Sequence, residues 1–242
     1  MAKTILVTGG ARGIGLAVTR RLAAAGHRVA VSYRADGEAA RSVRAELRAR
    51  GAEIEIFQSD LADPKDARAL PGRVGERFGG LDVLVNNAGM TDDASFLMME
   101  RARYREVLGT NLFGTMLLTG AALPLLLKAD APAIVIVASL GGVVGKEGQV
   151  AYATSKGALI GFTQWLARKY SSAGIAVNAV APGFIRTGMT ADLEPKMVDH
   201  VVGGTALRRV GRAEEVAEAV HFLLAPGYMQ ATTLRIDGGF NR

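Results

Sequence analysis

The sequence predicts an α/β fold in which a doubly wound, seven-stranded parallel sheet carries helices on both faces. Short β-branched apolar runs alternate with longer helix-forming stretches along the chain, which is typical of parallel sheets with crossover helices. The first apolar run leads directly into a glycine-rich turn. A length of 242 residues suits one domain with one core, and no repeat or linker divides it. We therefore expect a single domain over residues 1–242, with ligands at the carboxyl ends of its strands.

Seven runs have the composition of buried strands, and the stretches between them have the composition of helices. The strands are predicted at Ile5–Thr8, Val29–Tyr33, Ile54–Phe57, Val83–Asn86, Ile134–Ser139, Ala176–Val180 and Thr233–Ile236. The helices include Glu38–Arg50, Pro64–Phe78, Arg101–Lys128 and Glu214–Leu224. Pro124 is expected to kink or end the third of these helices.

The composition excludes several classes of protein. The sequence has no cysteine, which excludes disulfides and thiolate catalysis and fits a reducing cytoplasm. No window approaches the roughly 18 uninterrupted apolar residues of a membrane span, and the start lacks a signal-peptide pattern. We therefore expect a cytoplasmic protein with no membrane partner. The net charge is +6, but the arginines are dispersed and aromatic residues are few. We expect no nucleic-acid binding and assign the charge to attraction of acidic cofactors and carriers.

The first strand and the turn after it have the features of a dinucleotide phosphate site. Residues 4–8 lead into Gly9-Gly10-Ala11-Arg12-Gly13-Ile14-Gly15, and a helical pattern follows as far as Gly26, the expected C-cap. Glycines permit the tight turn and let the backbone approach a pyrophosphate, while the helix N-terminus supplies free N–H groups. The alternative is a plain glycine turn between core elements. The candidate cofactor residues in this turn are Gly9, Arg12, Gly13, Ile14 and Gly15.

A tyrosine and a lysine four residues apart are the candidate catalytic groups. Tyr152 and Lys156 lie in a helical pattern, so their side chains share one face of the helix. The lysine is expected to lower the pKa of the phenol, which makes Tyr152 a candidate proton donor near neutral pH. Ser139, at the end of a buried strand, can hydrogen-bond the same substrate oxygen. The alternative is two surface residues on an ordinary helix, because the spacing alone is a weak pattern.

With these motifs in this order, the chain resembles the short-chain dehydrogenase/reductase family over nearly its whole length. The motifs that carry the resemblance are Thr8 to Gly15 (TGxxxGxG), Asn86-Asn87-Ala88-Gly89 (NNAG), Asn111, Ser139, Tyr152, Lys156, and Pro182-Gly183 followed by Thr187. The resemblance implies a Rossmann-type domain that binds a nicotinamide cofactor. It also implies that residues 188–204, which interrupt the alternation, form a helical lid over the substrate; a plain surface excursion is the alternative.

The end of the second predicted strand indicates which nicotinamide cofactor is used. An NAD site usually carries an acidic residue here, whereas this strand runs into Tyr33-Arg34. Arg34 and Arg12 suit the 2′-phosphate of NADP, although Asp36 opposes them and a merely solvated Arg34 is the alternative. We therefore predict NADPH. By resemblance the cofactor site also includes Asp60 and Leu61 at the adenine, Asn86, Ala88 and Gly89 at the ribose, Pro182 and Gly183, and Ile185 and Thr187 at the nicotinamide end.

The resemblance implies the reduction of a carbonyl group. Hydride passes from the nicotinamide to the carbonyl carbon while Tyr152 protonates the oxygen, and Ser139 polarises the carbonyl. Lys156 tunes the tyrosine and holds the nicotinamide ribose. Asn111 is a poor helix former whose amide can hold a water that links Lys156 to solvent; a solvated helical asparagine is the alternative. No metal is assigned, because the three histidines, His27, His200 and His221, are scattered without ligand spacing.

Within the family, four segments resemble those of 3-oxoacyl-acyl-carrier-protein reductases, which implies a 3-oxoacyl thioester, carried on an acyl carrier protein, as substrate. These segments are Asn86–Asp93, Gly148–Tyr152, Asn178–Ile185 and Asp237–Gly239. The chain departs from the pattern at two positions where fatty-acid members often carry cations for the acidic carrier, and three nearby cations could substitute. The departing residues are Asp130 and Ala173, and the cations are Lys128, Arg168 and Lys169.

This departure leaves alternatives open. One is a discrete ketoreductase of polyketide or polyene synthesis rather than of fatty-acid synthesis. Others are a reductase of free ketones or alcohols and a cofactor-binding regulatory protein without turnover, although the intact set of serine, tyrosine, lysine and asparagine argues against the last. The family also implies a homotetramer packed through the helices of Asn111 and Tyr152.

Overall fold

The computed structural model describes residues 2–188, 199, 202–225 and 227–240, and at its centre is the predicted seven-stranded parallel sheet. The strand order is β3-β2-β1-β4-β5-β6-β9, and every neighbouring pair is parallel. The strands are β1 (Thr4–Val7), β2 (Arg28–Tyr33), β3 (Ile54–Gln58), β4 (Val83–Asn86), β5 (Ala133–Val137), β6 (Ala176–Pro182) and β9 (Thr233–Ile236). All seven predicted strands are confirmed. A separate two-stranded pair joins β7 (Ile185–Arg186) to β8 (Gly211–Arg212).

The strand order changes direction between β1 and β4. The chain winds outward from β1 through β2 to β3, returns to β4 beside β1, and then winds the other way to β9. Such a point leaves a crevice outside the carboxyl ends of the two central strands, and ligands of doubly wound sheets bind there. The sheet therefore places the predicted glycine turn after β1 beside the NNAG segment after β4.

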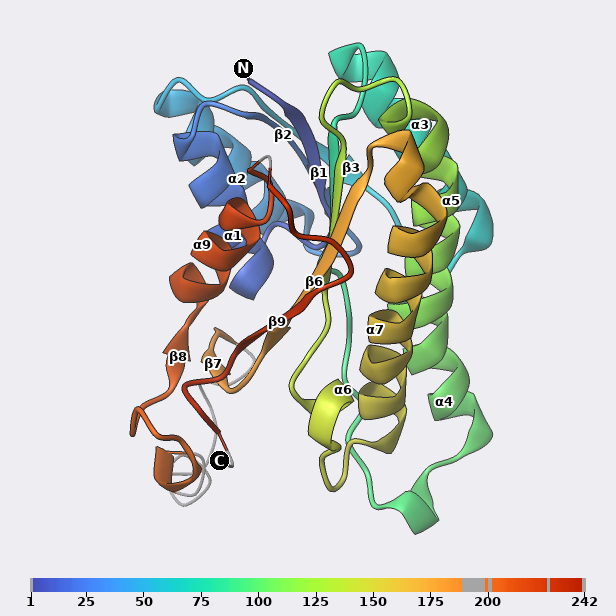
Figure 1. Ribbon diagram of the computed structural model, residues 1–242, viewed down its shortest axis with the longest axis vertical. Coiled ribbons are helices and arrows are strands. Elements are labelled where there is room, and N and C mark those ends of the chain that lie inside the picture. The colour runs from blue at the N-terminus through green and yellow to red at the C-terminus, as the bar shows by residue number, and fades with distance from the viewer. Residues whose placement is uncertain (1, 189–198, 200–201, 226, 241–242) are drawn as a thin grey trace.

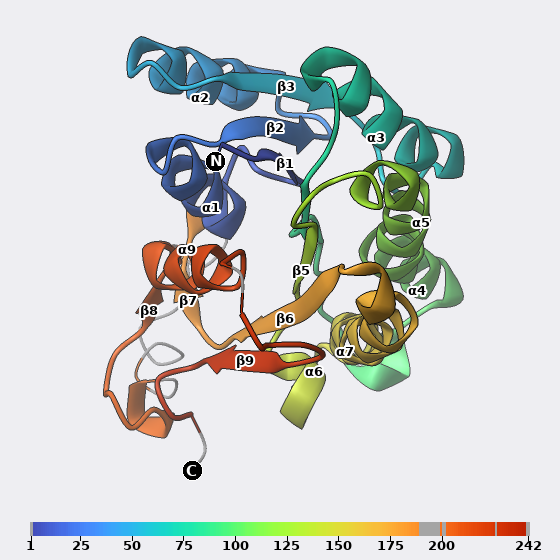
Figure 2. The same cartoon turned by 45° about the horizontal axis from the view of Figure 1, so that its top comes forward.

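Alternate side chains of the central strands pack into two separate cores. Ile5 and Val7 face a core with α1 (Gly13–Ala24), α2 (Gly37–Ala49) and α9 (Ala213–Phe222). Leu6 faces the other core, with α3 (Pro64–Phe78), α5 (Thr115–Leu126) and α7 (Val150–Tyr170). Figures 1 and 2 show these helical layers on opposite faces of the sheet. Because both faces are covered, the strands need apolar residues at every position, which explains their continuous apolar runs.

The predicted helix Arg101–Lys128 is present as three consecutive pieces. They are α4 (Arg101–Leu108), the π-helical turn η2 (Gly109–Gly114) and α5. Pro124 lies in the last turn of α5, as expected for a residue that helps to end the helix. By length and a mean hydropathy of 1.3 the stretch Arg101–Leu126 could also span a membrane, but 44% of that apolar window is buried in the fold. Since α5 packs against α3, this apolarity serves the protein core, and alone it is weak evidence for a membrane span.

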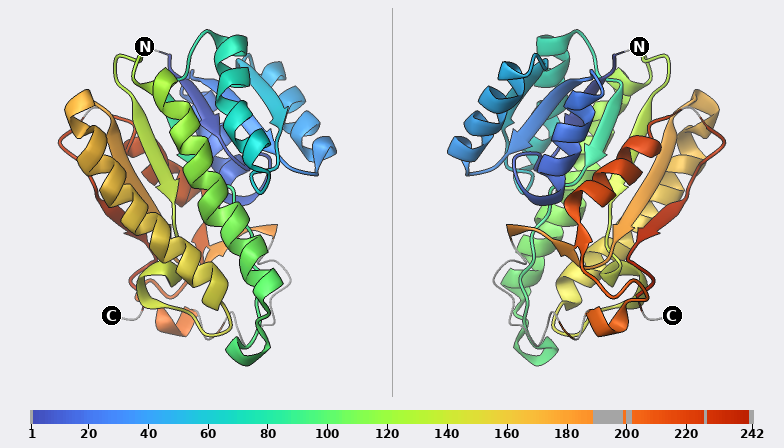
Figure 3. Two further views of the ribbon diagram at one scale, coloured as in Figure 1. Left: turned by 90° about the vertical axis from the view of Figure 1, so that its right-hand side faces the viewer. Right: turned by 90° about the vertical axis from the view of Figure 1, so that its left-hand side faces the viewer.

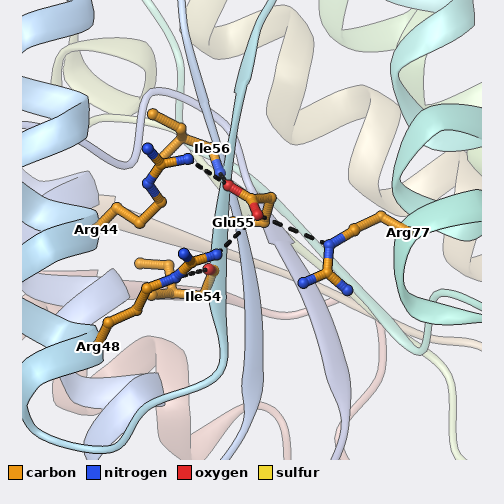
Figure 4. Close-up of polar contacts among 6 residues, drawn as sticks. All are labelled: Arg44, Arg48, Ile54, Glu55, Ile56 and Arg77. Atoms are coloured by element: carbon orange, nitrogen blue, oxygen red, sulfur yellow. Dashed lines mark hydrogen bonds and ion pairs between the residues drawn. The ribbon is translucent and has the colours of Figure 1, made fainter.

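Three arginines converge on one carboxylate at the edge strand β3. Glu55 accepts hydrogen bonds from Arg44 and Arg48 of α2 at 2.8 Å each, and its carboxylate lies 3.7 Å from Arg77 of α3 (Figure 4). The cluster therefore ties helices from both layers to the same strand. Charged side chains on an edge strand also discourage pairing with another chain.

The remaining short elements gather beyond the carboxyl ends of the strands, at the lower end of Figure 1 and of both views in Figure 3. They include η1 (Phe96–Met98), α6 (Gly141–Val144) and the β7–β8 pair, whereas η3 (Ser171–Ala173) follows α7 at the other end. Of the predicted lid at 188–204, residues 189–198, 200 and 201 lie outside the described residues, so the lid stays a prediction.

Candidate active site

The glycine turn between β1 and α1 forms a cradle for an anionic group. Gly9 and Gly13 have φ values of +62° and +55°, in the left-handed region that favours glycine. A Cβ on Gly15 would lie 2.2 Å from the backbone oxygen of Gly9, so no larger residue fits there. The first turn of α1 contains no acidic residue, and the Arg12 side chain does not cap it. Its N–H groups and the helix dipole therefore suit a phosphate, and the predicted residues fit a dinucleotide.

Asn87 and Thr8 hold this cradle against β4. Asn87 donates from Nδ2 to the backbone oxygens of Thr8 at 2.9 Å and Gly9 at 3.2 Å. The hydroxyl of Thr8 accepts the N–H groups of Asn87 and Ala88, both at 2.9 Å. Ala88 consequently lies against Gly9. The sequence motif included Asn87 but gave it no role; the structure shows that it positions the glycine turn.

Two of the predicted cofactor residues direct their side chains into the protein. Asn86 is 3% exposed and donates to the Thr119 hydroxyl of α5 at 2.9 Å, and Leu61 is buried in the core beside α3. Only the backbone of these two residues can therefore face a cofactor. Asp60 accepts a hydrogen bond from the N–H of Ala62 at 2.9 Å.

The turn after β2 presents arginines to solvent. Arg34 is exposed, and so is Arg12 in the glycine turn. Asp36, which was expected to oppose Arg34, uses its carboxylate to cap α2 through the N–H of Ala39 at 3.0 Å. Arg41 was not foreseen from the sequence; its Nη1 lies 3.1 Å from where a Cβ on Gly37 would be. The turn is thus flanked by cations whose nearest carboxylate is already engaged, a setting that favours a phosphate.

Lys156 is a buried cation beside the ring of Tyr152. Its side chain enters the fold from α7, is 3% exposed, and donates from Nζ to the backbone oxygen of Val137 in β5 at 2.7 Å. The Nζ atom lies 5.6 Å from the centroid of the Tyr152 ring. Burial lowers the pKa of Lys156 to about 8.

The expected lowering of the pKa of Tyr152 is not what the structure shows. Burial raises the pKa of its phenol, hydrogen bonding from Ser139 lowers it, and the charge of Asp93 raises it further, so that the net shift is upward. The net upward shift is set by burial, although the ammonium of Lys156 lies over the ring while it donates to Val137. Tyr152 is therefore held in its protonated form, with Ser139 in contact with it.

The π-helical turn η2 directs the side chain of Asn111 towards the segment after β4 and the first part of α7. Asn111 is fully buried; its Oδ1 accepts the N–H of Met90 at 2.8 Å, and its Nδ2 donates to Met90 O at 2.9 Å and to Ser155 Oγ at 3.1 Å. Ser155 in turn donates to the backbone oxygen of Tyr152 at 2.6 Å. Asn111 therefore links the segment after β4 to α7, and its role in a water relay stays a prediction. π turns of this kind are frequent at functional sites.

The end of β6 brings the last predicted cofactor residues to this edge. Pro182 accepts the N–H of Leu140, next to Ser139, at 2.8 Å, and Gly183 donates to Ile236 of β9 at 2.9 Å. Ile185 is buried in β7. The Thr187 side chain lies 3.7 Å from where a Cβ on Gly13 would be, so this segment returns to the glycine turn.

The two described histidines lie close together, although their sequence positions are far apart. The ring centroids of His27 and His221 are 6.2 Å apart, and burial together with neighbouring cations, Arg21 among them, lowers the pKa of both. Within the described part of the chain, no three potential ligands from histidine, cysteine, aspartate or glutamate group together. The assignment of no metal stays a prediction.

The chain matches known proteins along its whole length. A family model described as short chain dehydrogenase matches residues 3–198. The chain is 38% identical to the 3-oxoacyl-acyl-carrier-protein reductase FabG of Staphylococcus aureus, covering 99% of this chain and 98% of that protein. It is 39% identical to the 3-oxoacyl-acyl-carrier-protein reductase of a Synechocystis species, covering 98% and 96%.

Two solved structures have nearly the same fold. A short chain dehydrogenase from Burkholderia cenocepacia, in complex with NADP, superposes with a TM-score of 0.93 at 38% identity, covering 100% of this chain and 98% of that one. A double mutant of a Serratia marcescens short-chain dehydrogenase/reductase superposes with a TM-score of 0.94 at 32% identity, covering 99% and 98%.

Proposed function

This chain belongs to the short-chain dehydrogenase family, and we propose that it is an NADPH-dependent enzyme that reduces a 3-oxoacyl thioester, carried on an acyl carrier protein, to the 3-hydroxyacyl thioester. The observation that carries this proposal is the contact between Ser139 and Tyr152 beside the glycine turn, with the buried Lys156 behind the ring. The substrate class is supported by the relatives from Staphylococcus aureus and Synechocystis, both of which are 3-oxoacyl-acyl-carrier-protein reductases.

The residues present fit NADP. The first turn of α1 and the cradle of Gly9, Gly13 and Gly15 suit the pyrophosphate, and the exposed Arg12 and Arg34 suit the 2′-phosphate. The similar Burkholderia cenocepacia structure is a complex with NADP. When bound, NADPH supplies the hydride for the carbonyl carbon.

The remaining chemistry belongs to the chain. Tyr152 donates a proton to the carbonyl oxygen, a general-acid contribution of typically ~10²–10⁴-fold, and its phenol carries that proton at neutral pH. Ser139 hydrogen-bonds the same oxygen. Lys156, with a pKa of about 8, can release and take up a proton near neutral pH and so restore the phenol after each turnover. We further propose that residues 188–204 close over the substrate and exclude water.

The cations suggested for carrier docking lie far from this chemistry within one subunit. Arg168 and Lys169 are in the last turn of α7, whereas Tyr152 is in its first turn. Sixteen residues of helix separate Tyr152 from Arg168, which corresponds to about 24 Å. A carrier held by Arg168 would therefore have to span this distance to bring its acyl group to Tyr152 of the same subunit. The proposed homotetramer is supported by apolar side chains exposed on the helices of Asn111 and Tyr152, Phe113 at 57% and Trp165 at 58%.

A reductase of free ketones is the second candidate. Asp130 and Ala173, both exposed, stand where a carrier-dependent member is expected to present cations. We favour the carrier-bound substrate because the curated relatives share it, and we propose action in the cytoplasm without nucleic-acid or membrane partners. Fatty-acid and polyketide or polyene synthesis would use the same chemistry.

The deciding experiment compares one 3-oxoacyl group on the acyl carrier protein, on a short thioester and as a free ketone, following NADPH consumption. The carrier-bound substrate should give the highest kcat/KM, because remote binding energy holds the reactive carbonyl in place. Added salt should reduce that advantage, because exposed charges are screened beyond about 10 Å at 0.1 M. If kcat/KM were equal for all three substrates and insensitive to salt, the proposal of a carrier-bound substrate would be contradicted and a reductase of free ketones would be favoured.

A further inference from the structure

The segment that follows β4 carries two adjacent aspartates that one arginine binds. Arg103 of α4 donates from Nε to Asp92 Oδ2 at 2.6 Å and from Nη2 to Asp92 Oδ1. The same Nη2 donates to the backbone oxygen of Asp93 at 3.2 Å. This bidentate pair fixes the backbone of the segment, and with it the direction of the Asp93 carboxylate.

Gln149 connects that carboxylate to the catalytic helix. Gln149 is 9% exposed, and its Nε2 donates to Asp93 Oδ2 at 2.7 Å. Its backbone oxygen accepts the N–H of Ala153 at 2.7 Å, so Gln149 is the N-cap residue of α7, one turn before Tyr152. A second connection runs from the N–H of Ala94 to Gly148 O at 2.9 Å. The first turn of α7 is thus fastened to the segment after β4 through both a side chain and the backbone.

We propose that Asp93 and Gln149 form a positioning pair that fixes the first turn of α7, and with it the phenol of Tyr152, and that brings the Asp93 carboxylate close enough to act on that phenol. This role rests on the proposed function, in which Tyr152 is the general acid. A buried amide with a charged acceptor holds a narrow geometry, and displacement of a reacting group by about 1 Å can cost about 100-fold in rate.

Three groups face the phenol from the elements packed around it. Ser139 contacts it from the segment after β5, Lys156 lies over its ring from α7, and the charge of Asp93 acts on it from the segment after β4. Burial raises the pKa of Tyr152, Ser139 opposes that rise and Asp93 adds to it. Since a negative charge disfavours the phenolate, Asp93 favours the protonated phenol.

The charge is tested by Asp93→Asn, which keeps an acceptor for Gln149 but removes the negative charge. The pKa of Tyr152 is read from the ultraviolet absorbance of tyrosinate during a pH titration, as the difference between each protein and the same protein with Tyr152→Phe. It should fall in Asp93→Asn, and the alkaline limb of kcat for reduction should move to lower pH by the same amount. The matched control, Asp130→Asn, removes an exposed carboxylate elsewhere and should leave both unchanged.

The hydrogen bond from Gln149 to Asp93 is tested by exchanging its donor and its acceptor. Gln149→Glu places two carboxylates at hydrogen-bonding distance, so kcat should fall about tenfold or more at neutral pH and recover on acidification, when the pair shares a proton. The double variant Asp93→Asn with Gln149→Glu restores an amide–carboxylate bond in the opposite direction and should recover most of the lost kcat. Gln164→Glu, an exposed glutamine of α7, is the matched control.

Two results would overturn the positioning pair: an unchanged tyrosinate titration in Asp93→Asn, or a double variant no more active than Gln149→Glu at any pH. The KM for NADPH should stay constant throughout, because neither residue belongs to the glycine turn. The tyrosinate titration needs no turnover. If the wild-type chain reduced no 3-oxo substrate, the proposed function would be contradicted. The tyrosinate titration would still test whether Asp93 acts on the phenol of Tyr152.

Discussion

Lys156 donates its hydrogen bond to the backbone oxygen of Val137, at 2.7 Å, and places its Nζ 5.6 Å from the centre of the Tyr152 ring. The ammonium group is therefore anchored to a strand of the sheet and lies over the phenol ring. It is also almost completely buried, at 3% exposure. A buried charge with one hydrogen bond costs stability, so folding alone does not explain the position, whereas the proposed catalytic role does.

We predict that Lys156→Met abolishes turnover yet stabilises the fold at neutral pH. Methionine fills a similar volume without a charge. Because burial lowers the pKa of Lys156 from 10.5 to about 8, the charged lysine costs roughly 3 kcal/mol at most, and part of that is offset by the bond to Val137. The melting temperature, measured at a fixed protein concentration, should rise by several degrees.

The difference in stability between wild type and Lys156→Met should also depend on pH, in a direction that follows from the pKa of Lys156. As pH rises from about 8 to 10.5, the folded lysine loses its proton while the unfolded lysine keeps it, so the wild type gains stability relative to Lys156→Met. The advantage of the variant should therefore shrink across this range. A variant that is less stable at neutral pH, or whose advantage grows with alkalinity, would contradict the account.

Arg34→Asp should move cofactor preference from NADPH towards NADH. The change removes a cation from the turn after β2 and adds a charge that repels the 2′-phosphate. One charged hydrogen bond is worth about 1.5–3 kcal/mol, so the ratio of kcat/KM for the two cofactors should change by about 10- to 100-fold. Arg68→Asp, the same change at an exposed position of α3, should leave the ratio alone. If Arg34→Asp also leaves it alone, Arg12 or Arg41 reads the phosphate instead.

Gly15→Ala should weaken NADPH binding without unfolding the protein. A Cβ at this position would lie 2.2 Å from Gly9 O and 2.5 Å from Asn87 Nδ2, so the cradle must open. The dissociation constant, measured by fluorescence titration, should increase at least tenfold, while far-ultraviolet circular dichroism stays unchanged. Gly72→Ala in α3, where a Cβ meets nothing within 4 Å, should keep wild-type affinity and raise stability slightly. Equal affinity in the two variants would show that the cradle does not hold the cofactor.

Glu55→Gln should destabilise the edge of the sheet at neutral pH but not in acid. Burial raises the pKa of Glu55, but hydrogen bonds from Arg44 and Ile56 and the charge of Arg48 outweigh burial and leave it below its ordinary value of 4.5. The carboxylate therefore adds stability above that pH, and the contribution is lost as pH falls through the lowered pKa. Denaturant unfolding should show a loss of about 1–2 kcal/mol at neutral pH that vanishes in acid. A loss of equal size at both pH values would rule out an electrostatic origin.

The sequence predicted the seven strands and the residues of the glycine turn because both have local signatures. Apolar β-branched runs mark strands buried on both faces, and the φ of +62° at Gly9 is one that glycine adopts at little cost. Pairs that meet only after folding had no such signal. Asp93 and Gln149 are separated by 56 residues, and Asn111 and Ser155 by 44.

The protonation of Tyr152 could not be predicted from spacing either. Four residues along a helix do bring the side chains of Tyr152 and Lys156 together, as expected. The sign of the pKa shift of Tyr152, however, is set mainly by burial of the phenol, which the spacing of two residues does not reveal. The direction of the Asn86 side chain could not be predicted either. Asn86 is part of a motif assigned to the predicted cofactor site, but its side chain donates to Thr119 in the core.

The most direct test of the account is turnover by Tyr152→Phe with a 3-oxoacyl thioester and NADPH. The phenyl ring fills the same space but has no proton to donate, so kcat should fall by at least about 100-fold. NADPH affinity, measured by fluorescence titration on the same sample, should change little, because the glycine turn is untouched. That combination would establish Tyr152 as the general acid of a 3-oxoacyl reductase. Turnover within tenfold of the wild type would contradict it.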